Sequence, residues 1–593
     1  MIFGKHLNKY YRKYGLALLL GALTLLVVDY VELTVPHFYQ MVINGMNEGF
    51  VVEKGVRYVF DMDFLLEKIA KPMIFVIICM TVGRFLWRIC IFGSAVKVSF
   101  DLRNEMFAHS KELSRQYYQV NKVGDLMSLY TNDLDTVHEC FGAGFLMFFD
   151  ALIQGGMSIG KMFTMNPIMA LLTMIPSALL VAMSVVIGRS LKKKWHIRQE
   201  AYAALSDFSQ ESFSGIAVVK AFVKEGLELL AFKKLNRNNE KAAIDHTRGS
   251  VLLRVLVTLF VESIICIILG YGGYLVHEGV FNAGELMEFI GYFNAMVWPA
   301  MAISELIDMT SRGKGSLERI SKLLDAPVDV TDRADVQEMG EVRGDIEFRN
   351  LTFRYPGSDL ETLRNVSFTI HAGESVGFVG RTGAGKTTVV DLLLRTFNVP
   401  DGTIFLDGHD VNTVPIRQVR EACAYVPQDN FLFSDTIARN IAFSDADAER
   451  SRVERAAVLS DVDENIRGFS EGYETVLGER GVTVSGGQKQ RISIARALMK
   501  DAPVLIMDDS VSAVDTKTER TILKNLRETR AGKTTILIAH RISTIEQMDK
   551  VLFIDDGRII AFDTHDKLCR TCPEYAKMVE LQRLEEEGAK HNA

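Results

Sequence analysis

Residues 376–394 read VGFVGRTGAGKTTVVDLLL, and this stretch decides the fold of the C-terminal half of the chain. An apolar run from Val376 to Val379 precedes a glycine-rich loop from Gly380 to Thr387, and apolar residues at helical spacing follow. The short run predicts a buried strand, and the later spacing predicts a helix. A strand, a glycine-rich loop and a helix in this order are typical of a loop whose backbone N–H groups surround phosphates.

The side chains of this loop have separate expected roles. Lys386 reaches the β and γ phosphates of ATP, and the hydroxyl of Thr387 ligates Mg²⁺. The residues expected to contact the nucleotide are Gly380, Thr382, Gly383, Ala384, Gly385, Lys386, Thr387 and Thr388. The sequence therefore predicts that the chain binds ATP together with Mg²⁺.

A second ligand for the cation is expected from an acidic residue at the end of another buried strand. The apolar run from Val504 to Met507 ends in Asp508, which supplies such a carboxylate. These two motifs together indicate a P-loop nucleotide hydrolase, which is a broad class of proteins.

The motif from Val484 to Gln488, VSGGQ, narrows the class. It resembles the LSGGQ signature of the ABC transporters and lies just before the acidic strand. Further family marks follow in the family's order: Tyr355 as the adenine-stacking residue, Gln428 in YVPQD, the segment from Ser512 through Ala513 and Val514 to Asp515, and His540 after the strand 536–539. The resemblance implies that Ser485, Gly486, Gly487, Gln488 and Asp515 contact nucleotide, and that Gln428 also ligates the metal.

The residue after Asp508 departs from the family pattern. The family has a glutamate there that polarises the attacking water, whereas this chain has Asp509. Aspartate is one methylene shorter, so its carboxylate ends about 1.5 Å short of the water. Such a displacement costs about 100-fold in rate, and loss of a general base costs about 100- to 10,000-fold.

We therefore predict that this phosphate loop binds ATP and hydrolyses it slowly. The expected catalytic residues are Asp509, His540 and Gln428. The alternative is that Asp509 is adequate, because His540 and Gln428 remain to hold the γ-phosphate and Mg²⁺.

The N-terminal half is much more apolar. Six windows are each long enough for a membrane-spanning helix of roughly 20 residues. They cover 15–37, 72–96, 140–161, 167–188, 255–277 and 286–304. The sequence thus predicts an all-α transmembrane domain of six helices at 1–310, a linker at 311–343 and an α/β nucleotide-binding domain at 344–593.

Five of these windows contain ionisable residues, which are Asp29, Glu32, Arg84, Arg88, Asp150, Glu262 and Glu288. Charge in lipid is costly, so these side chains should face the bundle interior or a polar cavity. For Asp29, Glu32 and Glu288 a second interpretation stays open, in which they lie at helix ends and reach the membrane surface.

Basic residues set the orientation of the membrane half. They gather in the N-terminal segment, in the connection after residue 188 and at the exit near residue 312, which places these segments in the cytoplasm. Both chain ends are then cytoplasmic, and the protein is expected in the cell membrane. The long connections 97–139 and 189–254 lack proline, so the membrane helices should continue into the cytoplasm.

The fusion of a membrane domain to one nucleotide domain resembles the half-transporters of the exporter branch. By this resemblance, segments near 116–122 and 211–216 dock on the nucleotide domains as coupling helices. The alternative is that these segments are exposed helices without such a contact. The family pairs its nucleotide domains head to tail, which implies a second half-transporter as partner.

The sequence also resembles degenerate-site subunits of bacterial heterodimeric multidrug exporters. The expected partner is therefore a different chain with glutamate after its metal-holding aspartate, since two copies of this chain would form two slow sites. The implied activity is ATP-driven export of a drug-like, lipid or peptide substrate. Two alternatives are an ATP-gated regulatory subunit and a soluble ATPase, of which the apolar windows disfavour the second.

The composition disfavours other partners. The net charge is -7 and no basic run with interleaved aromatic residues occurs, so nucleic acid is not an expected partner. The pair Cys569 and Cys572 has no second ligand pair at zinc-binding spacing. Residues of the last window, Phe289, Tyr292, Phe293, Met296 and Trp298, either line an adaptable apolar cavity or pack and face lipid.

Overall fold

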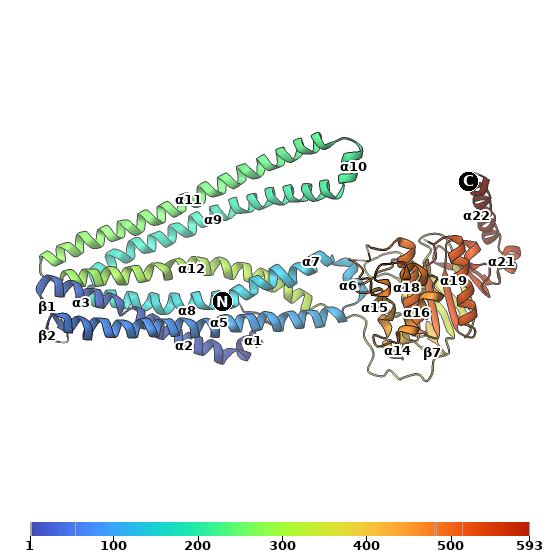
Figure 1. Cartoon of the computed structure of the whole chain (residues 1–593), viewed down its shortest axis with the longest axis horizontal. Helices are drawn as coiled ribbons and strands as arrows, with labels where there is room; N and C mark the ends of the chain where they lie inside the picture. The colour runs from blue at the N-terminus through green and yellow to red at the C-terminus, as the bar shows by residue number, and fades with distance from the viewer. Residues whose placement is uncertain (1–2, 54, 479–480, 482, 513, 592–593) are drawn as a thin grey trace. The chain divides into compact units, whose positions relative to one another are not determined.

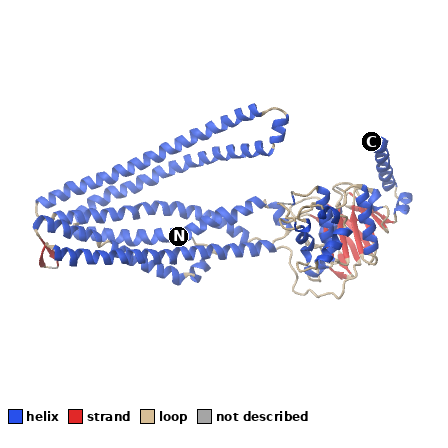
Figure 2. Cartoon of the chain, viewed as in Figure 1, coloured by secondary structure: helices blue, strands red, loops and turns tan. Residues whose placement is uncertain are grey.

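The computed structural model describes residues 3–53, 55–478, 481, 483–512 and 514–591. The chain forms two compact units, of which the first comprises Met1–Lys111 and Val123–Ala326 and the second comprises Glu112–Lys122 and Pro327–Ala593. Helices make up most of the first unit, and the second contains helices and sheets (Figure 2). The boundary expected after residue 310 lies inside helix α12, Ala283–Leu324.

Long helices dominate the first unit (Figure 1). Their bounds are α1 Asn8–Lys13, α2 Gly15–Glu32, α3 Val35–Glu48, α4 Met62–Phe64, α5 Lys71–Glu112, α7 Val123–Ser128, α8 Leu134–Met165, α9 Pro167–Ser214, α10 Ile216–Ala221, α11 Glu225–His277 and α12, with π-helical turns at Leu65–Ala70 and Leu129–Asp133. Helices α5, α9 and α11 extend far beyond the apolar windows, which confirms that membrane helices continue into the polar connections.

Among the described residues, five helical segments are long and apolar enough to cross a membrane. They are Gly15–Glu48, Met62–Glu112, Val123–Met165, Glu225–His277 and Ala283–Leu324. The fourth expected window lies on α9, where the described apolar stretch is shorter, Pro167–Leu180. The count of six spans therefore stays a prediction.

A β-hairpin that the sequence analysis did not predict lies between α3 and α4. Strand β1, Phe50–Glu53, pairs antiparallel with β2, Val56–Val59. The turn contains Gly55 at φ +81°, a backbone conformation that glycine adopts without steric cost.

Apolar side chains of α8, α9, α11 and α12 fill the interior of the helical unit. Phe289, Tyr292, Phe293 and Met296 are buried there, whereas Trp298 is 51% exposed. Phe293 and Met296 also line an apolar cavity of about 200 Å³. These residues of α12 thus mainly pack, and Phe293 and Met296 border a cavity as well.

Of the five carboxylates in the apolar windows, Asp29, Asp150 and Glu288 are buried and Glu32 is half-buried, whereas Glu262 is exposed, contrary to the expectation that it faces the interior. Asp29 and Glu288 are only 3% and 9% exposed. Glu288 accepts a hydrogen bond of 2.7 Å from the Tyr292 hydroxyl, and Glu32 pairs with Arg84 at 2.8 Å. These contacts favour the interior location over the interpretation in which the carboxylates reach the membrane surface.

The second unit is built on two sheets. The larger one has the strand order β12-β11-β5-β10-β9-β8, and its strands are β5 Ser375–Val379, β8 Cys423–Val426, β9 Val504–Asp508, β10 Thr534–Ile538, β11 Lys550–Asp555 and β12 Arg558–Asp563. All neighbours in it are parallel except β11 and β12. The smaller, antiparallel sheet has the order β4-β3-β6-β7, with β3 Ile346–Arg354, β4 Glu361–Ile370, β6 Ile404–Leu406 and β7 His409–Asp410.

Ten helices of the described residues surround or extend these sheets. They are α13 Lys386–Leu393, α14 Ile416–Glu421, α15 Ile437–Ile441, α16 Arg450–Leu459, α17 Asp463–Arg467, α18 Gly486–Lys500, α19 Thr516–Thr529, α20 Ile542–Ile545, α21 His565–Thr571 and α22 Pro573–His591. A further short helix, α6 at Arg115–Val120, belongs to this unit although its residues lie between α5 and α7 in the chain. The unit is therefore an α/β domain, as the sequence predicted.

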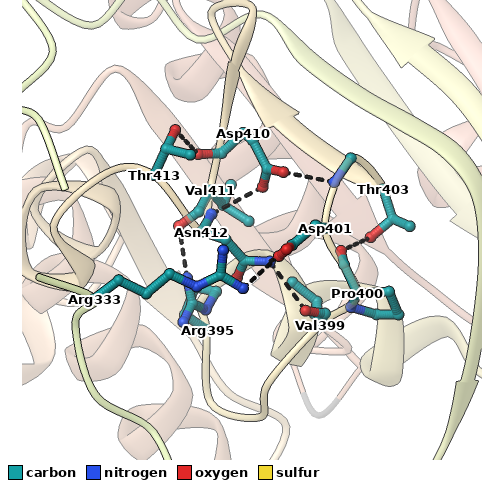
Figure 3. Close-up of polar contacts among 11 residues, drawn as sticks. Arg333, Arg395, Val399, Pro400, Asp401, Thr403, Asp410, Val411, Asn412 and Thr413 are labelled. Atoms are coloured by element: carbon teal, nitrogen blue, oxygen red, sulfur yellow. Dashed lines mark hydrogen bonds and ion pairs between the residues drawn. The ribbon is translucent and has the colours of Figure 1, made fainter. Parts of the chain in front are cut away.

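The segment before β3 is fastened to this domain by polar contacts (Figure 3). Arg333 pairs with Asp401, and the Asn412 amide donates to the same carboxylate at 2.7 Å. The buried Arg395 donates to the Val411 carbonyl at 2.6 Å, and Asp410 accepts from the N–H of Asn412 at 2.9 Å. The expected linker thus runs along the surface of the α/β domain, at least around Arg333.

Candidate functional site

Strand register gathers the expected site residues at one edge of the larger sheet. Asp508 of β9 lies opposite Ile538 of β10, which in turn lies opposite Phe378 of β5. Val426 of β8 lies opposite Met507. Because parallel strands end at the same edge, Gly380, Asp509, His540 and Gln428 all follow these strands at the position where α/β proteins bind ligands.

The phosphate loop requires glycine at two positions. A Cβ on Gly380 would collide with the carbonyl oxygen of Ile554 on the neighbouring strand β11. Gly385 has φ +100°, and a Cβ there would lie 2.7 Å from Leu363. Helix α13 begins directly afterwards at Lys386, so the loop presents a helix N-terminus to an anion.

Lys386 folds back over the loop. Its Nζ donates hydrogen bonds to the carbonyls of Gly380 at 2.8 Å and Arg381 at 3.0 Å, and the residue is only 6% exposed. Burial lowers the pKa of Lys386, although the nearby charges of Asp508 and Asp509 act in the opposite direction. The loop therefore holds a desolvated ammonium group beside its own backbone, where a phosphate can bind.

Asp508 and Thr387 form a pair of hard oxygen ligands. Asp508 ends β9 at 2% exposure, and its carboxylate interacts with the Thr387 side chain. Burial raises the pKa of Asp508, because the low-dielectric surroundings disfavour its charge. A Mg²⁺ ion prefers such oxygen ligands, and when bound it would neutralise charge on the β and γ phosphate oxygens. These two residues therefore fit the expected cation.

Asp509 is held by its backbone on both sides. Its N–H donates to the Ile538 carbonyl at 2.9 Å, and its carbonyl accepts from the Ser512 hydroxyl at 2.9 Å. The residue has φ +45°, a left-handed conformation that aspartate tolerates better than most residues. The Cα position is thus fixed by β10 and by the following turn, so the length of the side chain decides how far its carboxylate reaches.

Gln428 and His540 follow β8 and β10 as exposed residues. The His540 carbonyl accepts a hydrogen bond of 2.7 Å from Gln582 of α22. Tyr355 lies beside the phosphate-loop helix, because its hydroxyl is 2.9 Å from the Thr388 hydroxyl. The Tyr355 ring meets Phe397 edge-on at a centroid distance of 5.1 Å, which fixes its plane next to the loop.

The structure does not bring the signature motif to this loop. Ser485 is the N-cap of α18, and it and Gln488 form a capping box in which each side chain accepts from the other's backbone N–H. The side-chain hydrogen bonds described for these two residues join only them to each other. Asp515 caps α19 in a similar way, and Ala513 lies outside the described residues. The signature is thus available to another nucleotide.

One contact at the site was not found from the sequence. Asp391 of α13 is 4% exposed, and its carboxylate is 2.6 Å from a guanidinium nitrogen of Arg115, on the short helix α6. An acidic residue inside the apolar run VVDLLL is the signal that could have indicated a cationic partner, because buried carboxylates are almost always paired. The resemblance predicted that the segment near 116–122 docks on a nucleotide domain, but nothing in the sequence paired Arg115 with Asp391, which is 276 residues away.

Comparisons with known proteins agree with this geometry. Residues 18–300 match the family model described as ABC transporter transmembrane region, and residues 363–512 match the model described as ABC transporter. The chain is 35% identical to the Bacillus subtilis probable multidrug resistance ABC transporter ATP-binding/permease protein YheI, over 99% of both chains.

It is also 33% identical to the Escherichia coli multidrug resistance-like ATP-binding protein MdlA, over 95% of this chain and 94% of that one. The ATP-dependent lipid A-core flippase of Syntrophus aciditrophicus is 32% identical over 84% of each. A solved bacterial Atm1-family ABC exporter with ATP bound superposes with a TM-score of 0.76 at 25% identity, covering 96% of this chain and 98% of that one.

Proposed function

The chain belongs to the ABC transporters, as an exporter half in which a membrane domain is fused to an ATP-binding domain, and we propose that it works as the slow-hydrolysing half of a heterodimeric exporter. Its own phosphate loop binds ATP with Mg²⁺ and hydrolyses it slowly. Most turnover belongs to the partner's loop, which works against the signature from Ser485 to Gln488.

Asp509 is the observation that carries this proposal. It occupies the position of the water-polarising glutamate, and its backbone is tied to Ile538 and Ser512. A carboxylate about 1.5 Å short of the water loses about 100-fold in rate. The rest of the loop keeps the groups that bind nucleotide, so binding and hydrolysis are affected differently.

Two features favour a partner chain. The capping box of Ser485 and Gln488 is separate from this chain's own loop, so another ATP is needed to engage the signature. In addition, the hairpin of α9 and α11 carries exposed apolar side chains around α10, including Phe213, Val218 and Phe222 at 74%, 61% and 69% exposure. Such a patch is typical of a protein interface, here the nucleotide domain of the partner.

ATP drives the cycle because it binds the closed and the open states of the two paired nucleotide domains with different affinities. A γ-phosphate contacts the opposite signature only when the nucleotide domains are closed, so ATP binding shifts the equilibrium toward closure. Closure turns the membrane cavity outward, and loss of the γ-phosphate after hydrolysis lets the pair reopen toward the cytoplasm. The substrate is drug-like or lipid, as the similarity to multidrug exporters and a lipid flippase suggests. The transporter lies in the cell membrane with both chain ends in the cytoplasm.

Reconstitution tests this proposal. The full chain co-expressed with a neighbour-encoded ABC half-transporter should co-purify with it in a one-to-one complex, and the complex in vesicles should move a fluorescent drug when ATP is supplied. A chain that only regulates its partner would leave the partner's drug transport intact when it is removed. Stable homodimers with full ATPase activity would contradict the heterodimer proposal.

The pair of Arg115 and Asp391 gives a prediction about coupling between membrane and nucleotide domains. Helix α6 is continuous in the chain with the membrane helices but docks on the phosphate-loop helix through this pair. Replacing Arg115 by glutamine leaves a buried carboxylate without its cation, which costs about 1–3 kcal/mol. We expect basal ATPase activity to persist in the Arg115→Gln complex while its stimulation by transported drug falls about tenfold.

The ratio of drug-stimulated to basal ATPase activity in lipid nanodiscs measures this effect. Arg417→Gln is the matched control, because Arg417 pairs with Glu421 on an exposed helix surface of the same domain. Equal stimulation in both variants would mean that the Arg115 contact does not transmit the signal.

A further inference from the structure

We propose that a cavity between α2, α5, α8 and α12 binds an organic cation with an apolar, aromatic-sized body, and that Asp29 is the anionic group that receives it. This inference rests on the proposed function, because it assigns a substrate class to the membrane half of the exporter.

The cavity lies inside the membrane unit. It has a volume of about 400 Å³, which is in the range that holds a drug-sized ligand. Leu25 and Val28 of α2, Leu146 of α8 and the indole rings of Trp87 and Trp298 supply its apolar wall. A cavity with this wall accepts the body of a lipophilic molecule.

Two buried polar atoms in the cavity wall lack hydrogen-bond partners among the described residues. One is Oδ2 of Asp29, a residue that is 3% exposed, and the other is Nε1 of Trp87, which is 7% exposed. Buried polar groups are nearly always hydrogen-bonded, and an unpaired carboxylate is the costlier case. Asp29 lies in the middle of the apolar segment Gly15–Glu48, and an ionisable side chain at that depth is costly unless a partner compensates it, which points to a ligand.

The other charges of the cavity wall are already engaged. Glu32 pairs with Arg84 at 2.8 Å, and Asp150 accepts a hydrogen bond of 2.7 Å from the Trp298 indole. The guanidinium of Arg88 lies over the Trp87 ring at 5.2 Å. Three carboxyl groups thus line the cavity beside two guanidinium groups, and among the described residues Asp29 is the one of the three with an oxygen, Oδ2, that is buried without a hydrogen-bond partner.

The chemistry of the wall favours an organic cation over a metal ion. Among the described residues no three His, Cys, Asp or Glu side chains converge to hold a metal. A bulky organic cation instead satisfies the Asp29 carboxylate by charge and meets the indole rings of Trp87 and Trp298 through its apolar body. An anion of the same size would meet the same apolar wall, but the negative charge of Asp29 would repel it.

Binding of tetraphenylphosphonium tests the proposal without ATP. The full-length transporter in lipid nanodiscs should bind the radiolabelled cation, and Asp29→Asn should raise its Kd at least tenfold, whereas Asp29→Glu should keep the Kd within about threefold. The control is Glu288→Gln, which neutralises a buried carboxylate that already has Tyr292 and His37 as partners and lies outside this cavity. It should leave the Kd unchanged.

Charge selectivity gives a second readout on the unaltered protein, which does not depend on the folding of a variant. Tetraphenylborate has the same shape and opposite charge, and it should compete at least tenfold more weakly than unlabelled tetraphenylphosphonium. Three results would each overturn the proposal: equal Kd values for the unaltered protein and Asp29→Asn, equal competition by the anion, or no binding of the cation. Asp29 would then be hydrated and would bind no organic cation. Failure of the proposed exporter function is distinguishable, because it appears as loss of ATP-driven transport for every substrate.

Discussion

Replacing Gly380 by alanine should weaken ATP binding by roughly 10- to 100-fold, because forcing a methyl group into a packed site costs about 1–3 kcal/mol. The added Cβ would collide with the Ile554 carbonyl, which belongs to the neighbouring strand of the central sheet. That carbonyl cannot move without disturbing β11, so the phosphate loop must shift instead. Its backbone N–H groups then no longer converge on the phosphates.

Titration with a fluorescent ATP analogue measures this loss. Gly340→Ala serves as the control in the same domain, because a Cβ at Gly340 meets no atom within 4 Å. Thermal unfolding of both variants separates a local shift of the loop from a general loss of stability. Unchanged affinity in Gly380→Ala would show that the loop binds ATP in another conformation.

Replacing Asp509 by glutamate should accelerate hydrolysis at this chain's own site by about 100-fold, because the carboxylate moves about 1.5 Å closer to the water. The hydrogen bonds to Ile538 and Ser512 keep the Cα in place, so the extra methylene extends the reach of the side chain. His540 and Gln428 already follow the neighbouring strands and need no change.

The rate is measured in a complex whose partner carries glutamine in place of its catalytic glutamate, so that only this site turns over. Asp556→Glu makes the same chemical change at an exposed carboxylate and should have no effect, since the Asp556 side chain is 83% exposed. An unaltered rate in Asp509→Glu would mean that the site lacks something besides side-chain length.

Much of the grouping of the candidate site residues was predictable because these residues are local in sequence. The glycines of the loop, Lys386 and Thr387 form one contiguous motif, and Asp508 is identified by the apolar strand that it ends. Parallel strand order then explains why segments from Gly380 to His540 meet at one edge. The sequence also predicted a helical part followed by an α/β part, and helices that extend beyond the apolar windows.

What the sequence could not supply are contacts between distant segments. The partner of Asp391 is Arg115, on a helix that belongs to the other half of the chain by position. Asp29 lies in an apolar window of the sequence, but only the packing shows that Glu32 pairs with Arg84 whereas Oδ2 of Asp29 has no hydrogen-bond partner within the part of the chain that the structure describes. The hairpin at 50–59 was also missed, because strands of four residues carry little periodicity.

The proposed function depends most on an unequal division of ATP hydrolysis between the two halves of the transporter. The direct test is to compare the steady-state ATPase activity of the reconstituted heterodimer with Asp509→Asn in this chain and with glutamate replaced by glutamine in the partner. We expect the first variant to stay within about twofold of the unaltered complex and the second to lose about 100-fold or more, as removal of a general base does. Loss of turnover in Asp509→Asn alone would contradict the account.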